Sequence, residues 1–326
     1  MKPTIRDVAR EANVSVSTVS RVINNKESVH ESTRYIVQQA IDKLGFVPNK
    51  LAQSLTNNSS KMVAVFVPHI GPSFYGHLLE GIESQAGTYD YRIIFCNTQN
   101  NPARELDYLR FVEHYNIDGV IVASDFHSIE AIKELKLPTV TVDHILDETY
   151  PSVTSDNIKG GRLGAKALVE SGSKNILLFR GPSFLPTTME RTIGAMEILD
   201  NYPQVSVGYF DFDLVDPNRE LIKQVLLSNP NVDGIFAYDN TLALVTMEVL
   251  GKMNKKIPHD CRIVGFDNNY FSSISNPRLT TIEQSPAFMG KSAFNLLYKL
   301  MNNDLILEPH DIVDVKLIER DSSKKA

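Results

Sequence analysis

The sequence predicts an α/β protein with a small helical N-terminal domain and a larger body of two doubly wound parallel-sheet subdomains. Three observations predict this fold. Residues 4–24 have the spacing of two short amphipathic helices joined by a tight turn. From residue 61 the chain alternates short apolar strands with helices, which indicates parallel sheet buried on both faces. The alternation runs twice in succession, and a chain of 326 residues is too long for one compact core.

The first helix is predicted to begin after Thr4, which is placed to cap it. Asp7 follows three residues later, where its negative charge favours the positive end of the helix dipole. Val8, Ala9 and Ala12 share the apolar face of this helix.

Residues 13–15 interrupt the helical spacing, because Asn and Ser side chains compete for backbone hydrogen bonds. A second helix follows from about Val16, with Val19 and Val22 on its inner face. Its outward positions carry short polar side chains and one arginine: Ser17, Thr18, Arg21 and Asn24. Such a set suits base edges and phosphates in a major groove, so the pair is interpreted as a helix-turn-helix. An ordinary helical hairpin with a polar outer face is the alternative.

A third helix is predicted over residues 31–44, and Gly45 is a plausible helix stop. One face carries the residues expected to close a three-helix core: Ile36, Val37, Ala40, Ile41 and Leu44. His30 stands at the cap position, where a neutral imidazole is a weak cap. Residues 46–60 then have the composition of a linker, with a polar end and room for two helical turns.

Formal charge is distributed unevenly along the chain. The net charge is −6, but residues 1–60 hold eight basic and five acidic residues, a net +3, which leaves −9 for the rest. A basic head on an acidic body suits a protein whose head alone contacts phosphates. Because +3 is modest, tight binding is expected to need two heads, and hence a homodimer.

The body is predicted to contain two series of elements. Strands are expected at 62–67, 91–96, 120–123, 139–142 and 152–154, then at 175–179, 206–210, 234–237 and 262–266, with a last strand at 311–317. Helices are expected at 74–87, 103–115, 156–171, 191–200, 218–227, 241–253 and 285–301. Two sheets facing each other make a cleft at the carboxyl ends of their strands, where ligands bind in parallel sheets.

Strand ends therefore identify candidate cleft residues: Phe74, Tyr75, Ser124, Asp125, Arg191, Phe212 and Asp267. Charged groups that bond hydroxyls, with aromatic walls over C–H faces, suit a polyhydroxylated ring. Arg191 and Asp267 are expected to face each other across the cleft; a structural ion pair is the alternative. Gly160 and Gly161 more plausibly pack helices than cradle phosphate. His69 and His77 lie near the first strand and could approach a ligand, but they are interpreted as solvated loop residues.

Other classes of protein are disfavoured. An apolar run of about 18 residues is absent, which argues against a membrane span. No secretory h-region follows Met1, so a cytoplasmic protein is expected. Cys96 and Cys261 are interpreted as reduced core thiols, and no metal-ligand spacing occurs. Nucleophile-elbow, zinc-protease and P-loop motifs are absent. We therefore expect neither an enzyme nor a bound metal or cofactor.

The run from Thr4 to Asn24, TIRDVAREANVSVSTVSRVIN, resembles the N-terminal signature of the LacI/GalR family of transcriptional regulators. The resemblance is ungapped there and extends over essentially the whole chain. It implies a body like that of periplasmic sugar-binding proteins. The run 151–162, PSVTSDNIKGGR, is most similar to regulators of ribose or sucrose operons.

The family resemblance implies three regions. Residues 1–46 would be the helix-turn-helix domain, 47–60 a hinge helix and linker, and 61–326 the effector-binding and dimerisation domain. Subdomain one would comprise about 61–157 and 285–306, and subdomain two about 158–284 and 307–320. The hinge helix orders on DNA in this family; Asn49, Ala52 and Leu55 match its motif, and the matching leucine wedges into the minor groove.

The resemblance also implies residue roles. Arg191 and Asp267 match the effector-binding pair, and Phe74, Tyr75, Thr187 and Phe212 match other pocket positions. Two departures stand out. Leu185 replaces the arginine with which purine-responsive members read the base. Tyr238, which is also expected to bind the effector, replaces the asparagine of lactose-type members.

Together these observations predict a repressor of a sugar-utilisation operon, released from operator DNA by a small sugar or sugar phosphate. Val16, Ser17 and Arg21 would read bases, whereas Ser15, Thr18, Asn24 and Thr33 would hold phosphates. A regulator that needs a co-repressor or phosphoprotein partner, or a plain sugar-binding protein, is the alternative.

Overall fold

The structure is a computed structural model that describes residues 3–24, 28–47, 59–71, 74–123, 129–145, 149–214 and 216–324. The chain divides into two compact units. One consists of Met1–Met62 with His114–Asp118, and the other of Val63–Glu113 with Gly119–Ala326. Within the described ranges no helix is both long enough and apolar enough to cross a membrane.

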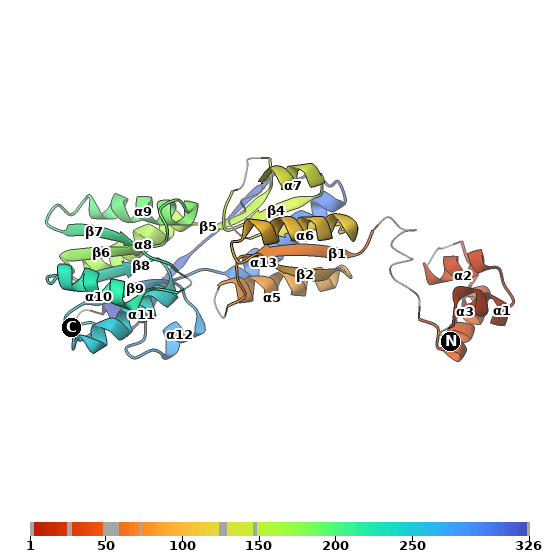
Figure 1. The fold of residues 1–326 in the computed structure, drawn as a ribbon, viewed down its shortest axis with the longest axis horizontal. Helices are drawn as coiled ribbons and strands as arrows, with labels where there is room; N and C mark the ends of the chain where they lie inside the picture. Colours follow the sequence, from red (N-terminus) through yellow and green to blue (C-terminus); the bar gives the residue numbers. More distant parts are fainter. Residues whose placement is uncertain are drawn as a thin grey trace. The chain divides into compact units, whose positions relative to one another are not determined.

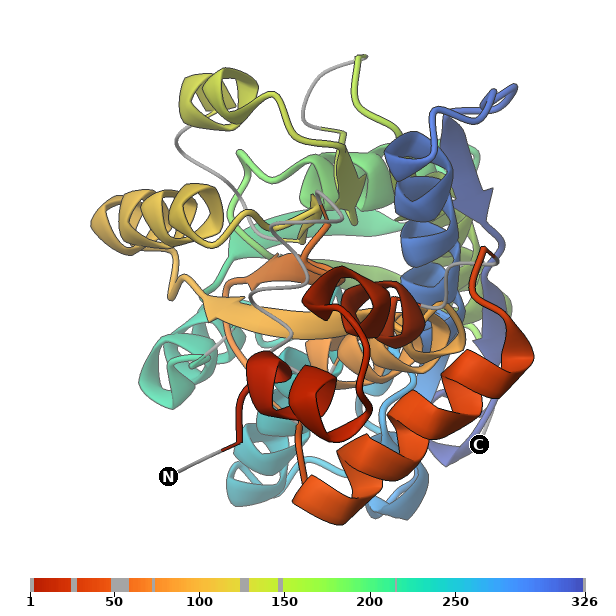
Figure 2. The same cartoon turned by 90° about the vertical axis from the view of Figure 1, so that its right-hand side faces the viewer.

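The N-terminal unit contains three helices, α1 (Ile5–Glu11), α2 (Val16–Ile23) and α3 (Glu31–Leu44). Figure 2 shows the long α3 in orange beside the two short helices in red. The Asp7 carboxylate accepts hydrogen bonds from the Thr4 backbone N–H at 2.9 Å and hydroxyl at 2.7 Å, which lowers the Asp7 pKa. Val8, Val19 and Val37 are fully buried and hold the three helices together.

Both predicted ends of α3 are confirmed, but one residue predicted to face the core does not. His30 Nδ1 accepts a long hydrogen bond of 3.4 Å from the Ser32 N–H, and Gly45 takes the left-handed conformation at φ +61°. Ile36 was expected in the core, yet it is 50% exposed. Two short helices cover only a narrow stripe of α3, and Val37 lies at the centre of that stripe.

The first sheet of the body has six strands in the order β11-β5-β4-β3-β1-β2. These are β1 (Met62–Val67), β2 (Arg92–Asn97), β3 (Gly119–Val122), β4 (Thr139–Val142), β5 (Ser152–Ser155) and β11 (His310–Val313). The ladder from β1 through β3, β4 and β5 to β11 is parallel throughout. Its helices are α5 (Phe74–Thr88), α6 (Pro102–His114), α7 (Ile129–Leu135) and α13 (Pro286–Met301). Figure 1 shows α5 and α6 on opposite sides of the sheet.

The second sheet has six strands in the order β12-β10-β9-β8-β6-β7. These are β6 (Asn175–Arg180), β7 (Ser206–Asp211), β8 (Gly234–Ala237), β9 (Arg262–Asp267), β10 (Thr280–Glu283) and β12 (Lys316–Ile318). Only β12 among the described strands of this sheet pairs antiparallel. The accompanying helices are α8 (Asn157–Glu170), α9 (Pro186–Leu199), α10 (Arg219–Ser228), α11 (Asn240–Lys252) and α12 (Tyr270–Ile274), and η1 (Asp321–Ser323) ends the chain.

The described chain crosses from one sheet to the other three times (Figure 1). The first crossing joins β5 to α8, the second joins β10 to α13, and the third joins β11 to β12. The sequence predicted one strand at 311–317 and placed 307–320 in subdomain two. The structure instead divides this stretch, because β11 pairs with β5 whereas β12 pairs with β10. The third crossing therefore lies between Val313 and Lys316.

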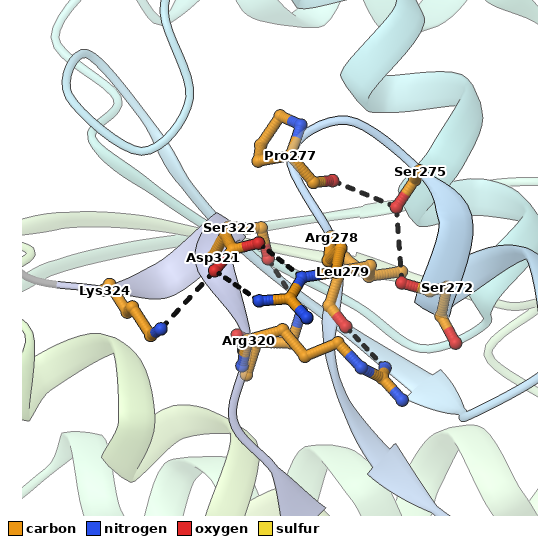
Figure 3. Close-up of polar contacts among 10 residues, drawn as sticks. Ser272, Ser275, Pro277, Arg278, Leu279, Arg320, Asp321, Ser322 and Lys324 are labelled. Carbon is orange, nitrogen blue, oxygen red and sulfur yellow. Dashed lines mark hydrogen bonds and ion pairs between the residues drawn. The ribbon is translucent and has the colours of Figure 1, made fainter.

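The chain beyond β12 is fixed to the second sheet by polar contacts. Asp321 accepts hydrogen bonds from Arg278 Nε at 2.7 Å and NH2 at 3.2 Å, which lower the Asp321 pKa to about 2 (Figure 3). Buried Ser322 donates to the Ile263 carbonyl at 2.6 Å. These contacts anchor the far end of the third crossing.

Candidate functional site

A cavity of about 450 Å³ lies between loops of the two sheets. The first sheet contributes residues that follow β1 and β4, including His69, Phe74, Tyr75, Asp143 and His144. The second contributes residues that follow β6, β8 and β9, including Leu185, Thr187, Arg191, Tyr238, Asp239, Asp267 and Asn269. Gln284, from the second crossing, completes the wall. The carboxyl ends of parallel strands are where such sheets bind ligands, and the volume suits a small molecule.

Arg191 lies in the second turn of α9 and is only 6% exposed. Its Nε donates to Asn157 Oδ1 at 2.9 Å, and its NH1 donates to the Tyr238 carbonyl at 2.5 Å. The guanidinium carbon lies 3.7 Å from the centroid of the Phe266 ring. Two hydrogen bonds and a cation–π contact thus fix the guanidinium at the cavity wall.

Two glycines of α8 make room for this arrangement. A Cβ on Gly161 would lie 2.2 Å from the Arg191 carbonyl oxygen, and one on Gly160 would lie 2.6 Å from the Phe266 ring. Both distances are far below van der Waals contact. The packing role expected for this glycine pair is therefore the one that the structure shows, since α8 and α9 meet there.

Asp267 ends β9 with a positive φ of 100°, a strained conformation for a residue with a side chain. Its Oδ1 accepts a hydrogen bond of 2.5 Å from Gln284 Nε2. Burial, together with the nearby Asp239 carboxylate, raises the pKa of Asp267 well above its ordinary value, and the Arg191 charge only partly offsets this. The cavity wall thus carries two neighbouring carboxyl groups, of which Asp267 keeps its proton to a higher pH than an ordinary aspartate.

Asp239 and His69 lie on opposite sheets and contribute different chemistry. Asp239 caps α11 by accepting hydrogen bonds from the N–H groups of Thr241 at 2.5 Å and Leu242 at 3.0 Å. Burial lowers the pKa of His69, which the Asp239 charge partly opposes. His69 Nδ1 is buried and has no hydrogen-bond partner among the described residues. A neutral imidazole therefore faces the cavity with an unsatisfied nitrogen.

An aromatic pair and an unsatisfied amide complete the wall. Phe74 and Tyr75, at the start of α5, have ring centroids 5.3 Å apart at 88°, and Tyr75 also lies against the His69 ring at 4.9 Å. Across the cavity, Asn269 Oδ1 is buried and unpartnered within the described chain. A ring with hydroxyls on its edge and C–H groups on one face would satisfy both features.

The N-terminal unit offers a second candidate surface on α2. Val16 is 41% exposed, and the Ser17 and Arg21 side chains are also exposed. Ser15 caps α2 through a 3.1 Å bond from the Thr18 N–H, and its hydroxyl lies 2.7 Å from that of Ser17. The result is a compact polar edge, with the exposed Arg21 near the end of the helix.

Two family models match the chain and together cover most of its length. "Bacterial regulatory proteins, lacI family" matches residues 4–49, and "Periplasmic binding proteins and sugar binding domain of LacI family" matches residues 60–318. The chain belongs to the LacI family. The helical unit is the regulatory head of that family, and the two-sheet body is its sugar-binding type of domain.

Among LacI-family relatives, the chain is 33% identical to a ribose operon repressor of Halalkalibacterium halodurans, covering 98% of this chain and 97% of the relative. It is 36% identical to a sucrose operon repressor of Streptococcus mutans, covering 87% and 88%. Among solved structures, a transcriptional regulator CelR–cellobiose complex matches with a TM-score of 0.73 at 26% identity, over 98% and 99% of the two chains. The lac repressor dimer bound to operator matches with a TM-score of 0.90 at 22% identity, over 99% and 100%, which shows the shared fold.

Six of the nine predicted effector residues line the cavity: Phe74, Tyr75, Thr187, Arg191, Tyr238 and Asp267. Ser124 and Asp125 lie outside the described residues. Phe212 does not line the cavity but packs in the core, 4.8 Å from the Phe179 ring. The expectation that Arg191 and Asp267 face each other across the cleft was wrong. Both residues lie on the side of the second sheet, because α9 follows β6 and Asp267 ends β9.

Sequence reasoning missed His69, Asp143, His144, Asp239, Asn269 and Gln284 as cavity residues. All six lie one or two residues after a strand, so a strand-end rule extended to two residues would have found those whose strands were predicted. His69 was interpreted as a solvated loop residue, but it is half-buried, since the Tyr75 ring covers it. Gln284 also directly follows a strand, β10, but that strand was not predicted from the sequence.

Of the predicted DNA-binding residues, Ser15, Val16, Ser17 and Arg21 are exposed, and Thr18, Asn24 and Thr33 are partly exposed. Asn24 Nδ2 donates to Ser20 Oγ at 3.4 Å. Asn49, Ala52 and Leu55 lie outside the described residues.

Proposed function

We propose that this chain represses a sugar-utilisation operon and leaves its operator when a small, uncharged sugar occupies the cavity. The observation that carries the proposal is the cavity itself. In a LacI-family body it combines a fixed guanidinium, a carboxyl pair and an aromatic pair, the groups that bind the edge and the face of a sugar ring. The relatives named ribose and sucrose operon repressors support the same class of effector.

The charges of the described wall favour an uncharged sugar over a phosphorylated one. Three acidic residues line the cavity, namely Asp143, Asp239 and Asp267. Arg191 already gives two N–H groups to Asn157 and Tyr238. The N-terminus of α11, which would otherwise attract a phosphate, is occupied by the Asp239 carboxylate. A phosphate would therefore meet repulsion with little compensating charge.

On the DNA side, Val16, Ser17 and Arg21 are proposed to read bases, because they are exposed on α2. Ser15, Thr18, Asn24 and Thr33 are proposed to hold phosphates, which position the head without specifying sequence. The family motif adds Asn49, Ala52 and Leu55 as a hinge helix, with Leu55 as the minor-groove wedge.

Two copies of the chain are proposed to bind a roughly palindromic site, one recognition helix per half-site. Residues 1–46, 47–60 and 61–326 would serve as head, hinge and effector domain. Closure of the sheets around the sugar would separate the hinges, with a coupling of about 1–3 kcal/mol. Relatives of this chain are named as repressors, and a non-enzymatic, cytoplasmic regulator is the corresponding proposal.

The test begins with a DNA duplex selected from a randomised library by the full-length protein. Affinity for this duplex is then measured with D-ribose, sucrose, cellobiose, D-xylulose and ribose 5-phosphate, and thermal unfolding is followed in parallel. The releasing sugar should also stabilise the protein, by about 2.7 kcal/mol at 100 times its Kd. Tighter duplex binding with sugar would indicate a co-repressor, and release by ribose 5-phosphate alone would refute the uncharged effector.

A variant pair separates the sugar site from the DNA site. Arg191→Ala should abolish sugar stabilisation and release while leaving duplex binding intact. Arg162→Ala is the matched control, because Arg162 lies on α8 and pairs with exposed Glu197 away from the cavity. Loss of duplex binding in a folded Arg191→Ala protein would contradict the role proposed for Arg191.

A further inference from the structure

Any movement of one sheet against the other must bend the three crossings of the body. The first crossing contains Ser155 and Asn157, and the second contains Gln284. All three side chains are almost completely buried, with exposures of 2%, 1% and 5%. Most buried polar side chains in proteins are hydrogen-bonded, so the partners of these three show what they connect.

One chain of hydrogen bonds joins both crossings to the cavity carboxyl. Ser155 Oγ donates to Gln284 Oε1 at 2.6 Å, and Gln284 Nε2 donates to Asp267 Oδ1 at 2.5 Å. Ser155 itself does not line the cavity. Among the described residues, its hydroxyl is connected to the ligand site through the Gln284 amide, and it also lies 3.3 Å from Met289 Sδ.

A second set of bonds joins the first crossing to the cavity guanidinium. Asn157 Oδ1 accepts from Arg191 Nε at 2.9 Å. Asn157 Nδ2 donates to the Ser155 carbonyl at 3.2 Å and to Glu190 Oε2 at 2.9 Å. The third crossing is attached as well, because the Asp156 N–H donates to the Val313 carbonyl at 2.9 Å.

We infer that Ser155, Asn157 and Gln284 are positioning residues that transmit occupancy of the cavity to the crossings. The inference rests on the proposed function, since it assigns the residues that connect the same sugar site to the crossings. A sugar that bonds Asp267 or Arg191 must realign groups already shared with the crossings. Since buried bonds cannot be left unmade without penalty, the realignment moves the crossings instead of stopping at the cavity wall.

Ser155→Ala tests the relay, with Ser152→Ala as its matched control. Both serines lie buried on β5, but the Ser152 hydroxyl is 2.9 Å from His310 Nδ1 within the first sheet and has no link to the cavity. The probes are the selected duplex and the four uncharged sugars, with full-length protein. A wild-type release ratio of about 5–150-fold is expected for this kind of coupling.

For Ser155→Ala we expect sugar affinity without DNA, and duplex affinity without sugar, to stay within about twofold of wild type, while the release ratio falls by about fivefold or more. Ser152→Ala should keep the wild-type ratio. An unchanged ratio in Ser155→Ala, or an equal loss in both variants, would overturn the relay while leaving the proposed function standing. A wild-type protein that no sugar releases would overturn both.

Hydrogen exchange on the wild-type protein gives a test that does not depend on a variant folding. The releasing sugar should change amide exchange at 155–157 and at 283–285, and not only in the loops that line the cavity. Unchanged exchange at both crossings on sugar saturation would also overturn the relay.

Discussion

Asp267→Asn is the most informative single change at the cavity. The carboxyl group accepts a hydrogen bond from Gln284 Nε2 at 2.5 Å and lies beside the Asp239 carboxylate. The amide that replaces it keeps an oxygen for Gln284 and gains an N–H that can donate to Asp239. The shape and the bonds are therefore retained, whereas the titration is removed.

The pH dependence of stability should change as a consequence. The folded-state pKa of Asp267 is raised, mainly by burial and by Asp239, from an ordinary value of 3.8. Between these two pKa values the folded protein binds more protons than the unfolded chain, so stability falls as pH rises. Each pH unit within that window lowers the free energy of unfolding by about 1.4 kcal/mol, or about 2–4 °C in Tm. The Asp267→Asn protein should lack this decrease in the free energy of unfolding with pH.

Thermal unfolding of both proteins from pH 5 to pH 8, without sugar, measures the effect. The Tm advantage of Asp267→Asn should grow with pH and level off above the folded-state pKa. Glu197→Gln is the control, since its exposed carboxylate has a pKa lowered by Arg162 and is ionised throughout this range in both states. Parallel Tm curves for wild type and Asp267→Asn would refute the raised pKa of Asp267.

Three further experiments test other parts of the molecule. Gly161→Ala should lower the free energy of unfolding by about 1–3 kcal/mol in chemical denaturation, because its Cβ would lie 2.2 Å from a carbonyl oxygen of α9. Gly87→Ala is the control, since its Cβ would meet nothing within 4 Å; it should be neutral or stabilising, and equal effects of the two substitutions would contradict the close-packing argument. Leu55→Ala should weaken binding to the selected duplex far more than to random DNA, and equal losses would contradict the wedge. Burial raises the thiol pKa of Cys96 and Cys261 to about 12, so iodoacetamide at pH 8 should label both only after unfolding, as mass spectrometry would show; labelling of the native protein would contradict their burial.

Periodicity predicted the fold well because, in most elements, the local hydrophobic pattern agrees with the secondary structure that the element adopts. The apolar run at 62–67 is a buried parallel strand, and the third helix occupies 31–44 as its spacing indicates. The prediction of a single last strand was wrong for a physical reason. Residues 310–318 contain one continuous β-type pattern, but pairing partners on two different sheets divide it, and partner choice is tertiary information.

The sequence identified part of the cavity wall, but it missed residues that lie one or two positions after a strand, and it did not give the arrangement of the residues that it found. Arg191 and Asp267 were identified, but their placement on one sheet depends on strand order, which spacing does not encode. Phe212 also follows a strand, yet Phe179 and the surrounding core take up its ring. A side chain at a strand end can turn inward or outward, and local packing decides which.

The distribution of groups around the cavity bears on how a sugar could act as a switch. The fixed guanidinium and the carboxyl pair belong to the second sheet, whereas Phe74 and Tyr75 belong to the first. The aromatic pair and the charged groups line the same cavity, and we propose that a sugar bonded to Arg191 and Asp267 packs more closely on Phe74 and Tyr75 when the sheets approach each other. A ligand shifts an equilibrium only by its difference in affinity between the two states, and we propose that closer contact of the C–H face with the two rings supplies that difference. A polyol that lacks an apolar face should therefore occupy the second sheet without favouring closure, and so bind without releasing DNA.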